Sequence, residues 1–379
     1  MEIRNRKGKA THIRMRKPAD MHQHVRRGAM LRLVVPMIAK RFSKAIIMPN
    51  TKPPITTYDM AVEYREEIRA VITWQQPLWP LMTLYLTDHL DPHEVRISRE
   101  AGILAGVKYY PHGLTTNSDS GVKDPASLWN KDTKPYKVLC ELAYYSGVLL
   151  LHAADGLDKQ GNELDPWDQE KHFIKETLPR IRDAHPTLKI SVEHLSTKEG
   201  AAYMEKHGDH KLLGCSLTAQ HLLLDRRDMF RSGFRPHRFW WPIIQRQEHK
   251  EALRELAKKD YPFVWLGSDS APHPVGAKET DCCSGGVLMA HAGIELYVEA
   301  FEDIDALDKL ESFASINGPR FFGLSPSESM IELVREEWEV DDSFRCDKPS
   351  DEIHPLGKVW DEVIPFRLGE KVRWKLAGD

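Results

Sequence analysis

The fold is decided by the stretch Gly147–His194, which reads GVLLLHAADGLDKQGNELDPWDQEKHFIKETLPRIRDAHPTLKISVEH. It begins and ends with short apolar runs, Gly147–His152 and Lys189–His194, of the kind expected for strands that are buried on both faces. Between them, Asp168–Ala184 predicts an amphipathic helix, because its apolar side chains recur on one stripe, namely Phe173, Ile174, Leu178 and Ile181. The stretch therefore predicts one strand–helix–strand unit of a parallel sheet.

The same alternation continues on both sides of this unit. Six further apolar runs of strand length are Asp20–Val25, Lys44–Pro49, Leu81–Leu86, Ile103–Tyr109, Leu212–Thr218 and Phe263–Ser268. Helices are predicted over Tyr58–Val71, Glu248–Lys259 and Leu288–Phe301. A capping box, with Ser196 as the N-cap and Glu199 three residues later, predicts the start of another helix. Eight strands alternating with helices indicate an α/β fold, a (β/α)₈ TIM barrel.

The length fits a single barrel with additions. A chain of 379 residues is too long for one small domain but accommodates an α/β barrel of about 250 residues. We expect one domain over residues 1–379, with a barrel core of about 12–325 and a C-terminal extension of about 326–379. The polar, acidic segment Asp341–Pro355 is interpreted as a surface insertion.

Composition and charge exclude several classes of function. With 53 Lys and Arg against 56 Asp and Glu, the net charge is −3, which argues against a nucleic-acid binder driven by bulk charge. No apolar run approaches the roughly 18 residues that a membrane span needs, and the basic Met1–Arg16 lacks the apolar core of a secretory signal. Five cysteines, an odd number, indicate a reducing compartment, so we expect a cytoplasmic protein. The adjacent Cys282 and Cys283 have no second cysteine pair nearby and do not predict a structural zinc site.

Polar side chains gather at the carboxyl ends of the predicted strands. They are His22, His24, Asn50, Lys108, His152, His194 and Asp269. In a (β/α)₈ barrel these strand ends form one face, and that face holds the active site. The sequence therefore predicts an active site built from these side chains.

Four of these side chains are histidines, which favours a metal site. His22 and His24 are two residues apart, and on a strand that spacing points both imidazoles to the same side, where they can share one metal ion. His152 and His194 come from different strands and can supply a second metal site. A single histidine is more often a structural or surface residue, but four at matching strand ends indicate metal. Histidine with carboxylate ligands suits zinc best, with manganese or cobalt as substitutes.

Lys108 and Asp269 complete the candidate site. An ammonium group facing two dications would be repelled, so Lys108 must be neutral or chemically altered. A lysine whose pKa is lowered can react with carbon dioxide to give a carbamate, which can bridge two metals. The alternative is a lysine that extends to solvent or pairs with Asp269. Asp269 can bind a metal and act as a base, and its alternative role is a helix N-cap.

A longer series of motifs runs along the chain in a fixed order. It comprises His22–Arg26, Ile47–Asn50, Lys108–Pro111, Thr115–Ser118, Val192–His194, Arg235–His237, Ser268–His273, Asn317–Leu324 and Ile331–Arg335. This series resembles the dihydroorotase family, in its shorter bacterial and fungal type within the amidohydrolase superfamily. The resemblance covers nearly the whole chain, from about His12 to Trp374. The His-x-His pair alone is shared across the superfamily, whereas the ordered set is specific.

The resemblance implies a binuclear centre with two Zn²⁺ per subunit. One ion would be bound by His22, His24, Asp269 and a carbamate on Lys108, and the other by the same carbamate with His152 and His194. Asp269 would take a proton from the attacking water and pass it to the leaving nitrogen. The resemblance implies that N-carbamoyl-L-aspartate and (S)-dihydroorotate interconvert in pyrimidine biosynthesis, on a cytoplasmic homodimer without nucleic-acid or membrane partners.

The resemblance also implies a set of substrate contacts. Arg26, Asn50 and His273 would clamp the substrate carboxylate, which fits the bidentate binding of carboxylates by arginine. Thr115 and Thr116 would belong to a loop that closes over the substrate and excludes water. The remaining implied contacts are His152, Trp241 and Gly285.

Some positions depart from the family pattern, and two alternatives stay open. Trp240 and Trp241 stand where smaller residues are usual, Gly285 stands where an alanine backbone contact is expected, and segments 155–166 and 341–363 are longer than usual. A related cyclic amidase, such as a hydantoinase or allantoinase, need not clamp an α-carboxylate, so the predicted clamp favours dihydroorotase. A catalytically inactive scaffold would typically lose metal ligands, and here all six positions are filled.

Overall fold

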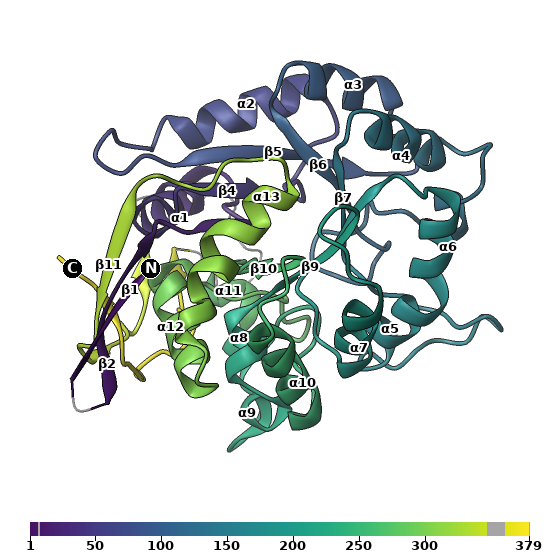
Figure 1. The fold of residues 1–379 in the computed structure, drawn as a ribbon. Helices are drawn as coiled ribbons and strands as arrows, with labels where there is room; N and C mark the ends of the chain where they lie inside the picture. Colours follow the sequence, from purple (N-terminus) through teal and green to yellow (C-terminus); the bar gives the residue numbers. More distant parts are fainter. Residues whose placement is uncertain (7, 347–360, 379) are drawn as a thin grey trace.

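The computed structural model describes residues 1–6, 8–346 and 361–378. At its centre, eight parallel strands follow the order β10-β9-β8-β7-β6-β5-β4-β3. The strands are β3 (Ala19–Gln23), β4 (Lys44–Ile47), β5 (Trp79–Leu86), β6 (Leu104–Tyr109), β7 (Val148–Leu151), β8 (Lys189–Val192), β9 (Leu213–Leu217) and β10 (Val264–Leu266). At the closing seam, Asp269 N donates to His22 O at 3.0 Å. His24 N donates to Ser270 O at the same distance. The predicted (β/α)₈ barrel is confirmed (Figure 1).

Helices cover the outside of the barrel (Figure 1). They are α1 (Gly28–Arg41), α2 (Tyr58–Arg69), α3 (Pro92–Glu100), α4 (Lys134–Tyr144), α5 (Gln169–His172), α6 (Leu178–Ala184), α7 (Lys198–His207), α8 (Ala219–Leu223), α9 (Arg226–Phe230), α10 (Gln247–Lys258), α11 (Val275–Lys278), α12 (Gly293–Asp303) and α13 (Gly318–Phe321). Most of the apolar core lies between sheet and helices, and a smaller core fills the barrel interior. In that interior the rings of Trp265 and Phe321 are 4.6 Å apart. Lys189, the first residue of β8, donates to Phe321 O at 3.0 Å, so α13 closes the amino-terminal end of the barrel.

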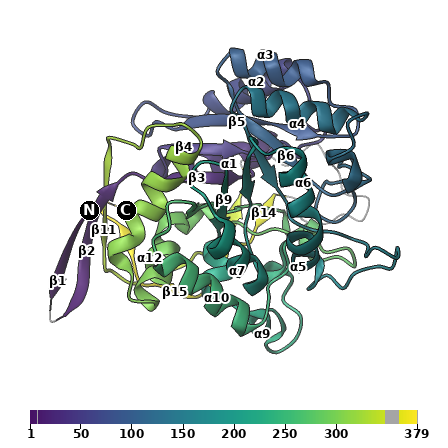
Figure 2. The same cartoon turned by 45° about the vertical axis from the view of Figure 1, so that its right-hand side comes forward.

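A second sheet brings the two ends of the chain together. Its four strands are β1 (Glu2–Arg6), β2 (Lys9–Arg16), β11 (Met330–Val334) and β16 (Lys375–Leu376), in the order β1-β2-β11-β16. Strands β2 and β11 pair antiparallel, with Ile13 opposite Leu333, and both of these side chains are buried. Strands β1 and β2 extend away from the barrel as a ribbon (Figure 2). Residues before the barrel and after it therefore stabilise one another.

The helix predicted over Asp168–Ala184 is confirmed in place, but it is not one regular α-helix. A π-helical turn, Phe173–Thr177, separates α5 from α6, and Leu178 N donates to Phe173 O. Pro179 explains the change, because it has no N–H to donate to the carbonyl four residues earlier. The predicted apolar stripe is buried as expected, at Phe173, Ile174, Leu178 and Ile181.

Two predicted helix starts were wrong. The N-cap of α7 is Thr197, whose Oγ1 accepts from Gly200 N at 3.0 Å, and not Ser196. The Ser196 hydroxyl instead donates to the buried carboxylate of Glu170 at 2.6 Å. The helix predicted from Leu288 begins at Gly293, because Ser270 Oγ accepts from the two backbone N–H groups of residues 289 and 290.

The predicted surface insertion, Asp341–Pro355, falls only partly within the described residues. Its residues 347–355 lie outside the described residues. In the described part, β13 (Phe344–Arg345) pairs antiparallel with β14 (Glu362–Val363), and Val363 is buried. A second short pair joins β12 (Trp338–Glu339) to β15 (Lys371–Val372). Within the described ranges, no helix is both long and apolar enough to cross a membrane.

Candidate metal centre and substrate pocket

A small cavity lies at the carboxyl ends of the barrel strands, where the sequence predicts the site. Its volume is about 20 Å³. The predicted site residues that line it are His22, His24, Arg26, Asn50, Thr115, Thr116, His152, His194, Trp241, Asp269 and Gly285. Two predicted residues do not line it. Lys108 lies in β6 with its Nζ 5.1 Å from the centre of the Tyr110 ring, and His273 contacts Arg26.

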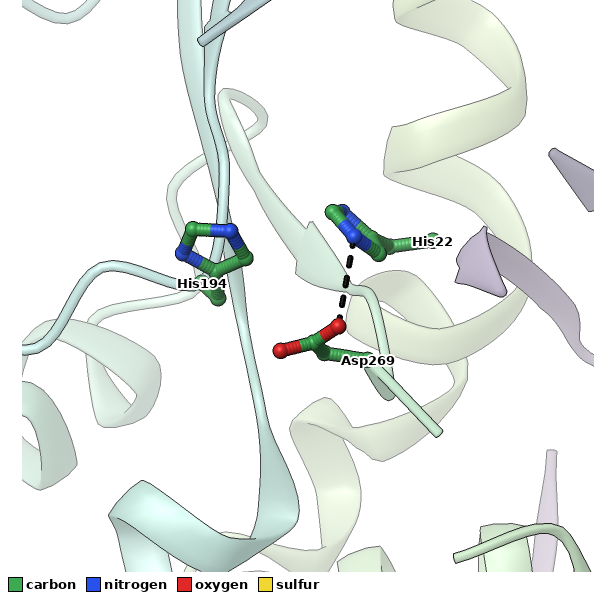
Figure 3. A group of neighbouring side chains, drawn as sticks. All are labelled: His22, His194 and Asp269. Atoms are coloured by element: carbon green, nitrogen blue, oxygen red, sulfur yellow. Dashed lines mark ion pairs between the residues drawn. The ribbon is translucent and has the colours of Figure 1, made fainter. Parts of the chain in front are cut away.

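His22, His24 and Asp269 form a compact buried cluster at the closing seam. The two imidazole Nε2 atoms are 3.2 Å apart. Asp269 Oδ1 lies 3.3 Å from Nε2 of His22 and 3.1 Å from Nε2 of His24. Figure 3 shows the carboxylate facing His22, with His194 on the other side of the gap. One carboxylate oxygen thus meets two imidazole nitrogens.

His152 and His194 form a second pair beside the first. Nδ1 of His152 is 3.1 Å from Nε2 of His194. The ring centres of His22 and His194 are 5.0 Å apart, and single atoms of His22, His194 and Asp269 all lie within 4.8 Å of one another. The two groups predicted from the sequence are therefore contiguous in space.

The residues present fit a metal centre. Two fully buried nitrogens of this cluster, Lys108 Nζ and His194 Nδ1, have no hydrogen-bond partner in the described part of the chain. Unsatisfied buried polar atoms are costly and rare in native proteins. Several imidazoles converging on one carboxylate oxygen also form the donor set that zinc prefers. A bound metal would use nitrogen lone pairs that otherwise face one another.

Burial and neighbouring charges set the protonation of two key groups. Burial acts to raise the pKa of Asp269, but the imidazoles of His22 and His24 outweigh it and hold that pKa well below its ordinary value. Asp269 is therefore a carboxylate that can accept a proton. Burial lowers the pKa of Lys108 to about 8. The neutral amine, which is the form that reacts with carbon dioxide, is accessible near neutral pH.

Three site residues adopt left-handed backbone conformations. The φ angles are 58° at Arg26, 41° at His194 and 49° at Asp269. Such conformations are strained for residues other than glycine, at a cost on the order of 1 kcal/mol or more, and they cluster at functional sites. The strand predicted to reach His194 accordingly ends at Val192. The turns after the strands aim these side chains at the cavity.

Two neighbours orient the first pair of histidines. Glu193, which is fully buried, accepts from Nδ1 of His22 at 2.6 Å. Asn50 Oδ1 accepts from Nδ1 of His24 at 2.8 Å. Both bonds leave Nε2 of the imidazole facing Asp269, as metal-binding histidines require. Sequence reasoning missed this role of Glu193, and the only signal for it was its place beside His194.

The predicted carboxylate clamp is partly assembled. Arg26 Nε donates to Pro272 O at 3.1 Å, and one Nη2 hydrogen points to Nε2 of His273 at 2.9 Å. Burial, followed by the charge of Arg26, holds the pKa of His273 well below its ordinary value, so His273 is a neutral acceptor. Arg26 Nη1 is buried and has no partner among the described residues. Asn50, the third predicted member, uses its amide to hold His24 and Thr116 O.

The two tryptophans that depart from the family pattern play different parts. Trp240 is buried in the core, where its Nε1 lies 3.2 Å from Nε2 of His221. Of these two tryptophans, Trp241 is the one that lines the cavity. A Cβ at Gly285 would fall well inside van der Waals contact with the Trp241 indole. The two departures from the family pattern are therefore linked, because the Trp241 indole occupies the space that a side chain at Gly285 would need.

Lys278 fastens the loop that carries Gly285. Its ammonium donates to Phe239 O at 2.8 Å, Ser284 O at 2.8 Å and Gly286 O at 2.9 Å, which uses all three of its hydrogens. The side chain is almost completely buried. Sequence reasoning did not find this residue, because its acceptors are backbone atoms from two separate segments.

The loop with Thr115 and Thr116 lies over the cavity and is attached on both sides. Thr116 Oγ1 donates to Gly285 O at 2.9 Å, and Thr116 O accepts from Asn50 Nδ2 at 3.2 Å. Thr115 is held within the loop, because its N and O both bond to Ser118 Oγ. The loop therefore joins the end of β4 to the Gly285 loop.

Comparison with known proteins gives the chain its family. No family model matches. A dihydroorotase from Azoarcus sp. strain BH72 is 41% identical over 365 residues, which cover 96% of this chain and 99% of the relative. A dihydroorotase from Aromatoleum aromaticum is 40% identical over 364 residues, with coverage of 96% and 99%. A crystal structure of dihydroorotase from Saccharomyces cerevisiae in complex with 5-fluoroorotic acid has a TM-score of 0.84 and 31% identity, covering 97% of this chain and 98% of that one.

More distant structures share the fold alone, such as an L-hydantoinase from Arthrobacter aurescens with a TM-score of 0.73 and 17% identity over 97% of this chain and 84% of that one. Fold and site together define a barrel hydrolase of the amidohydrolase class, which acts on cyclic amides. Within that class, the chain belongs to the dihydroorotase family.

Proposed function

We propose that this chain interconverts N-carbamoyl-L-aspartate and (S)-dihydroorotate in pyrimidine biosynthesis. One observation carries the choice of substrate. Arg26 presents a buried guanidinium at the wall of the cavity, with Nη1 unpartnered among the described residues. Dihydroorotate has a carboxylate that can bind there, whereas hydantoin has none. A carboxylate would make charge-assisted hydrogen bonds with this group, in keeping with the orotate analogue in the yeast relative.

We propose that two zinc ions occupy the clustered ligands. His22, His24 and Asp269 would bind one, His152 and His194 would bind the other, and a carbamate on Lys108 would bridge them. This assignment is supported by the buried Lys108 Nζ, which makes no hydrogen bond to any residue in the described ranges. When bound, such ions supply Lewis-acid polarisation of the amide carbonyl and lower the pKa of water.

The side chains of this protein divide the remaining work. Asp269, held ionised by its histidine neighbours, takes a proton from the water nucleophile and passes it to the ring nitrogen that leaves. Arg26 binds the substrate carboxylate, His273 holds the Arg26 guanidinium in place by accepting from its Nη2, and Asn50 keeps His24 in the required orientation. His152, Trp241 and Gly285 form the rest of the wall around the substrate.

The loop of Thr115 and Thr116 acts as a lid. The cavity of about 20 Å³ is far below the roughly 300 Å³ at which ligand pockets begin. The loop must therefore move to admit the substrate, and its return excludes water from the reaction. Its attachment through the two bonds of Thr116 is weak enough to open.

One experiment tests the proposed function directly. Purified protein is assayed with dihydroorotate, N-carbamoyl-L-aspartate and hydantoin, while bound zinc is counted by atomic emission and Lys108 is examined by crystallography. We expect turnover of the first two substrates, about two zinc ions per chain and a carbamate on Lys108. Preferential turnover of hydantoin would instead identify a hydantoinase, and no turnover with full zinc would identify a scaffold. We also propose a cytoplasmic homodimer, for which sedimentation and cell fractionation are the tests.

A further inference from the structure

A second, larger pocket lies at the opposite end of the barrel from the metal-binding cluster. It has a volume of about 720 Å³ and is formed where β4 and β5 begin, beside the last turns of α2 and the start of β11. In Figure 1 these elements adjoin on one side of the barrel. The volume is within the roughly 300–1,000 Å³ typical of small-molecule sites. No residue of the proposed active site lines this pocket.

Positive charge dominates the walls of this pocket, which we call the basal pocket. Five cationic side chains line it, and no carboxylate of the described residues does: Lys17, Lys40, Lys44, Arg65 and Arg69. Glu66, which is half exposed, pairs with Arg65 at 3.3 Å and with Arg69 at 3.2 Å. This one carboxylate does not balance even the two arginines that share it. The basal pocket therefore favours an anionic occupant.

Lys44 is the least exposed of the five cations that line the basal pocket. It is 9% exposed, and within the described ranges its Nζ has no hydrogen bond or ion pair, only the Trp79 ring with its centre 5.8 Å away. Lys44 lines the basal pocket, and partial burial lowers the pKa of its ammonium group. An anion bound in the pocket would supply the counter-charge that this group lacks among the described residues. The strand register fixes the arrangement, because Lys44 and Trp79 are paired residues at the start of β4 and β5.

Trp79 adds an aromatic surface to the same walls. Its indole is 54% exposed, although it lies on a barrel strand whose other residues are buried. Exposed indoles beside cations are platforms on which nucleobases stack. Arginines in turn are the residues that bind phosphate oxygens bidentately. The basal pocket thus offers both halves of one recognition chemistry, a cationic group for phosphate and a flat apolar face for a base.

We propose that the basal pocket binds a nucleoside monophosphate, with its phosphate at Lys44, Arg65 and Arg69 and its base against Trp79. This site is separate from the reaction centre and is independent of which cyclic amide the enzyme hydrolyses. A free phosphate would satisfy the cations but leave the indole uncovered. A nucleoside would cover the indole but leave Lys44 without a counter-charge. Both parts of the ligand are therefore needed for tight binding.

Isothermal titration of the zinc-loaded protein with AMP tests the proposal, with adenosine, ribose 5-phosphate and inorganic phosphate as separate arms. We expect one AMP per chain with a dissociation constant below 1 mM at low salt, and at least tenfold weaker binding of each partial ligand. Raising the salt concentration should weaken AMP binding, because exposed charges contribute. Saturable binding of ribose 5-phosphate as tight as that of AMP would overturn the role of Trp79. No saturable AMP binding would overturn the site.

Matched variants locate the binding. Arg65→Gln and Arg69→Gln should each weaken AMP binding about tenfold or more, since each removes a charge-assisted hydrogen bond. Trp79→Leu should weaken AMP binding but not phosphate binding. Arg96→Gln is the matched control, because Arg96 is an exposed arginine on the neighbouring helix α3, outside the basal pocket. Melting temperature and turnover of dihydroorotate should be unchanged in all four. Equal AMP affinity in Arg65→Gln, Arg69→Gln and the control would contradict the proposal.

Discussion

At the scale of single residues, Asp269 combines two demands that usually conflict. It must stay ionised although it is buried, and it must still accept a proton. The two imidazoles that hold its pKa low meet the first demand, and its second carboxylate oxygen is available for the other, since both imidazoles meet Oδ1.

Asp269→Asn therefore tests the proton transfer. The amide keeps an oxygen near the histidines but cannot accept a proton, so kcat should fall by about 10²–10⁴-fold, as for other general bases. The measurement is the steady-state rate with dihydroorotate, made on protein whose zinc content equals that of the wild type. Near wild-type turnover at full zinc content would exclude Asp269 as the base.

Lys108 presents a buried amine that has no hydrogen-bond partner among the described residues, and metal ions bound by a carbamate would give this group partners. Lys108→Ala should abolish most turnover and lower the zinc content. Adding acetate or propionate should restore part of both, because these acids replace the carbamate oxygens in the space that the side chain leaves. Zinc content and rate are measured together over a series of acid concentrations. Full activity of Lys108→Ala without added acid would show that the lysine is not a ligand.

Arg26 separates substrates that carry a carboxylate from those that do not. Arg26→Ala leaves that carboxylate without a charge-assisted partner, a loss of about 1.5–3 kcal/mol. We expect kcat/KM for dihydroorotate to fall about ten- to a hundred-fold, while any slow turnover of hydantoin is unaffected. If both substrates lose the same factor, Arg26 has only a structural role in its contact with Pro272.

At the scale of elements, the loop between β10 and α12 shapes one wall of the cavity. It is fastened by Lys278 and by Thr116, and it fits against Trp241 only because Gly285 has no side chain. The effects of substitutions at Trp241 and at Gly285 should therefore be coupled.

A double-mutant cycle measures this dependence. Gly285→Ala alone should lower the unfolding free energy by about 1–3 kcal/mol through overpacking and should reduce kcat/KM. Combining it with Trp241→Leu, which frees the space, should recover most of that loss. Urea unfolding and steady-state kinetics on the four proteins provide the cycle. Strictly additive effects would mean that the indole and the loop do not constrain each other.

Most strands and helices of this fold, and most residues of its candidate site, could be predicted from the sequence because each follows a pattern of neighbouring residues. Each strand is a short apolar run, and each predicted ligand lies at the carboxyl end of one or just beyond it. The errors arise where a distant group intervenes. The carboxylate of Glu170 accepts a hydrogen bond from the Ser196 hydroxyl, so this hydroxyl does not cap α7. The hydroxyl of Ser270 accepts from the N–H of residue 289, and α12 begins later than predicted. For the same reason Glu193 could not be assigned, since its partner His22 lies at the other end of the sheet.

At the scale of the whole molecule, a buried histidine makes stability depend on pH. Burial lowers the pKa of His221 from 6.5 to about 4. Between these values the unfolded chain binds more protons than the folded protein, so stability is lost as the pH falls from 6.5 towards 4. The loss amounts to about 2 kcal/mol near pH 5.

His221→Asn should remove this dependence. Between about pH 7.5 and pH 5, the variant should lose about 2 kcal/mol less of its unfolding free energy than the wild type, as measured by urea unfolding. His210→Asn is the control, because the His210 side chain is 63% exposed. Parallel pH profiles for the wild type and the His221 variant would show that His221 does not titrate in this range.

The pairing of β2 with β11 has a consequence for how the chain is made. Strand β2 leaves the ribosome more than three hundred residues before its partner β11, as the pairing of Ile13 with Leu333 requires. Throughout that interval the nascent chain carries an amphipathic strand whose open edge can pair with another chain. The eight barrel strands can pair during this interval, but β2 cannot pair with β11 until β11 has been synthesised. Premature release of the chain before β11 would therefore produce a species prone to aggregate, although all eight barrel strands had been synthesised.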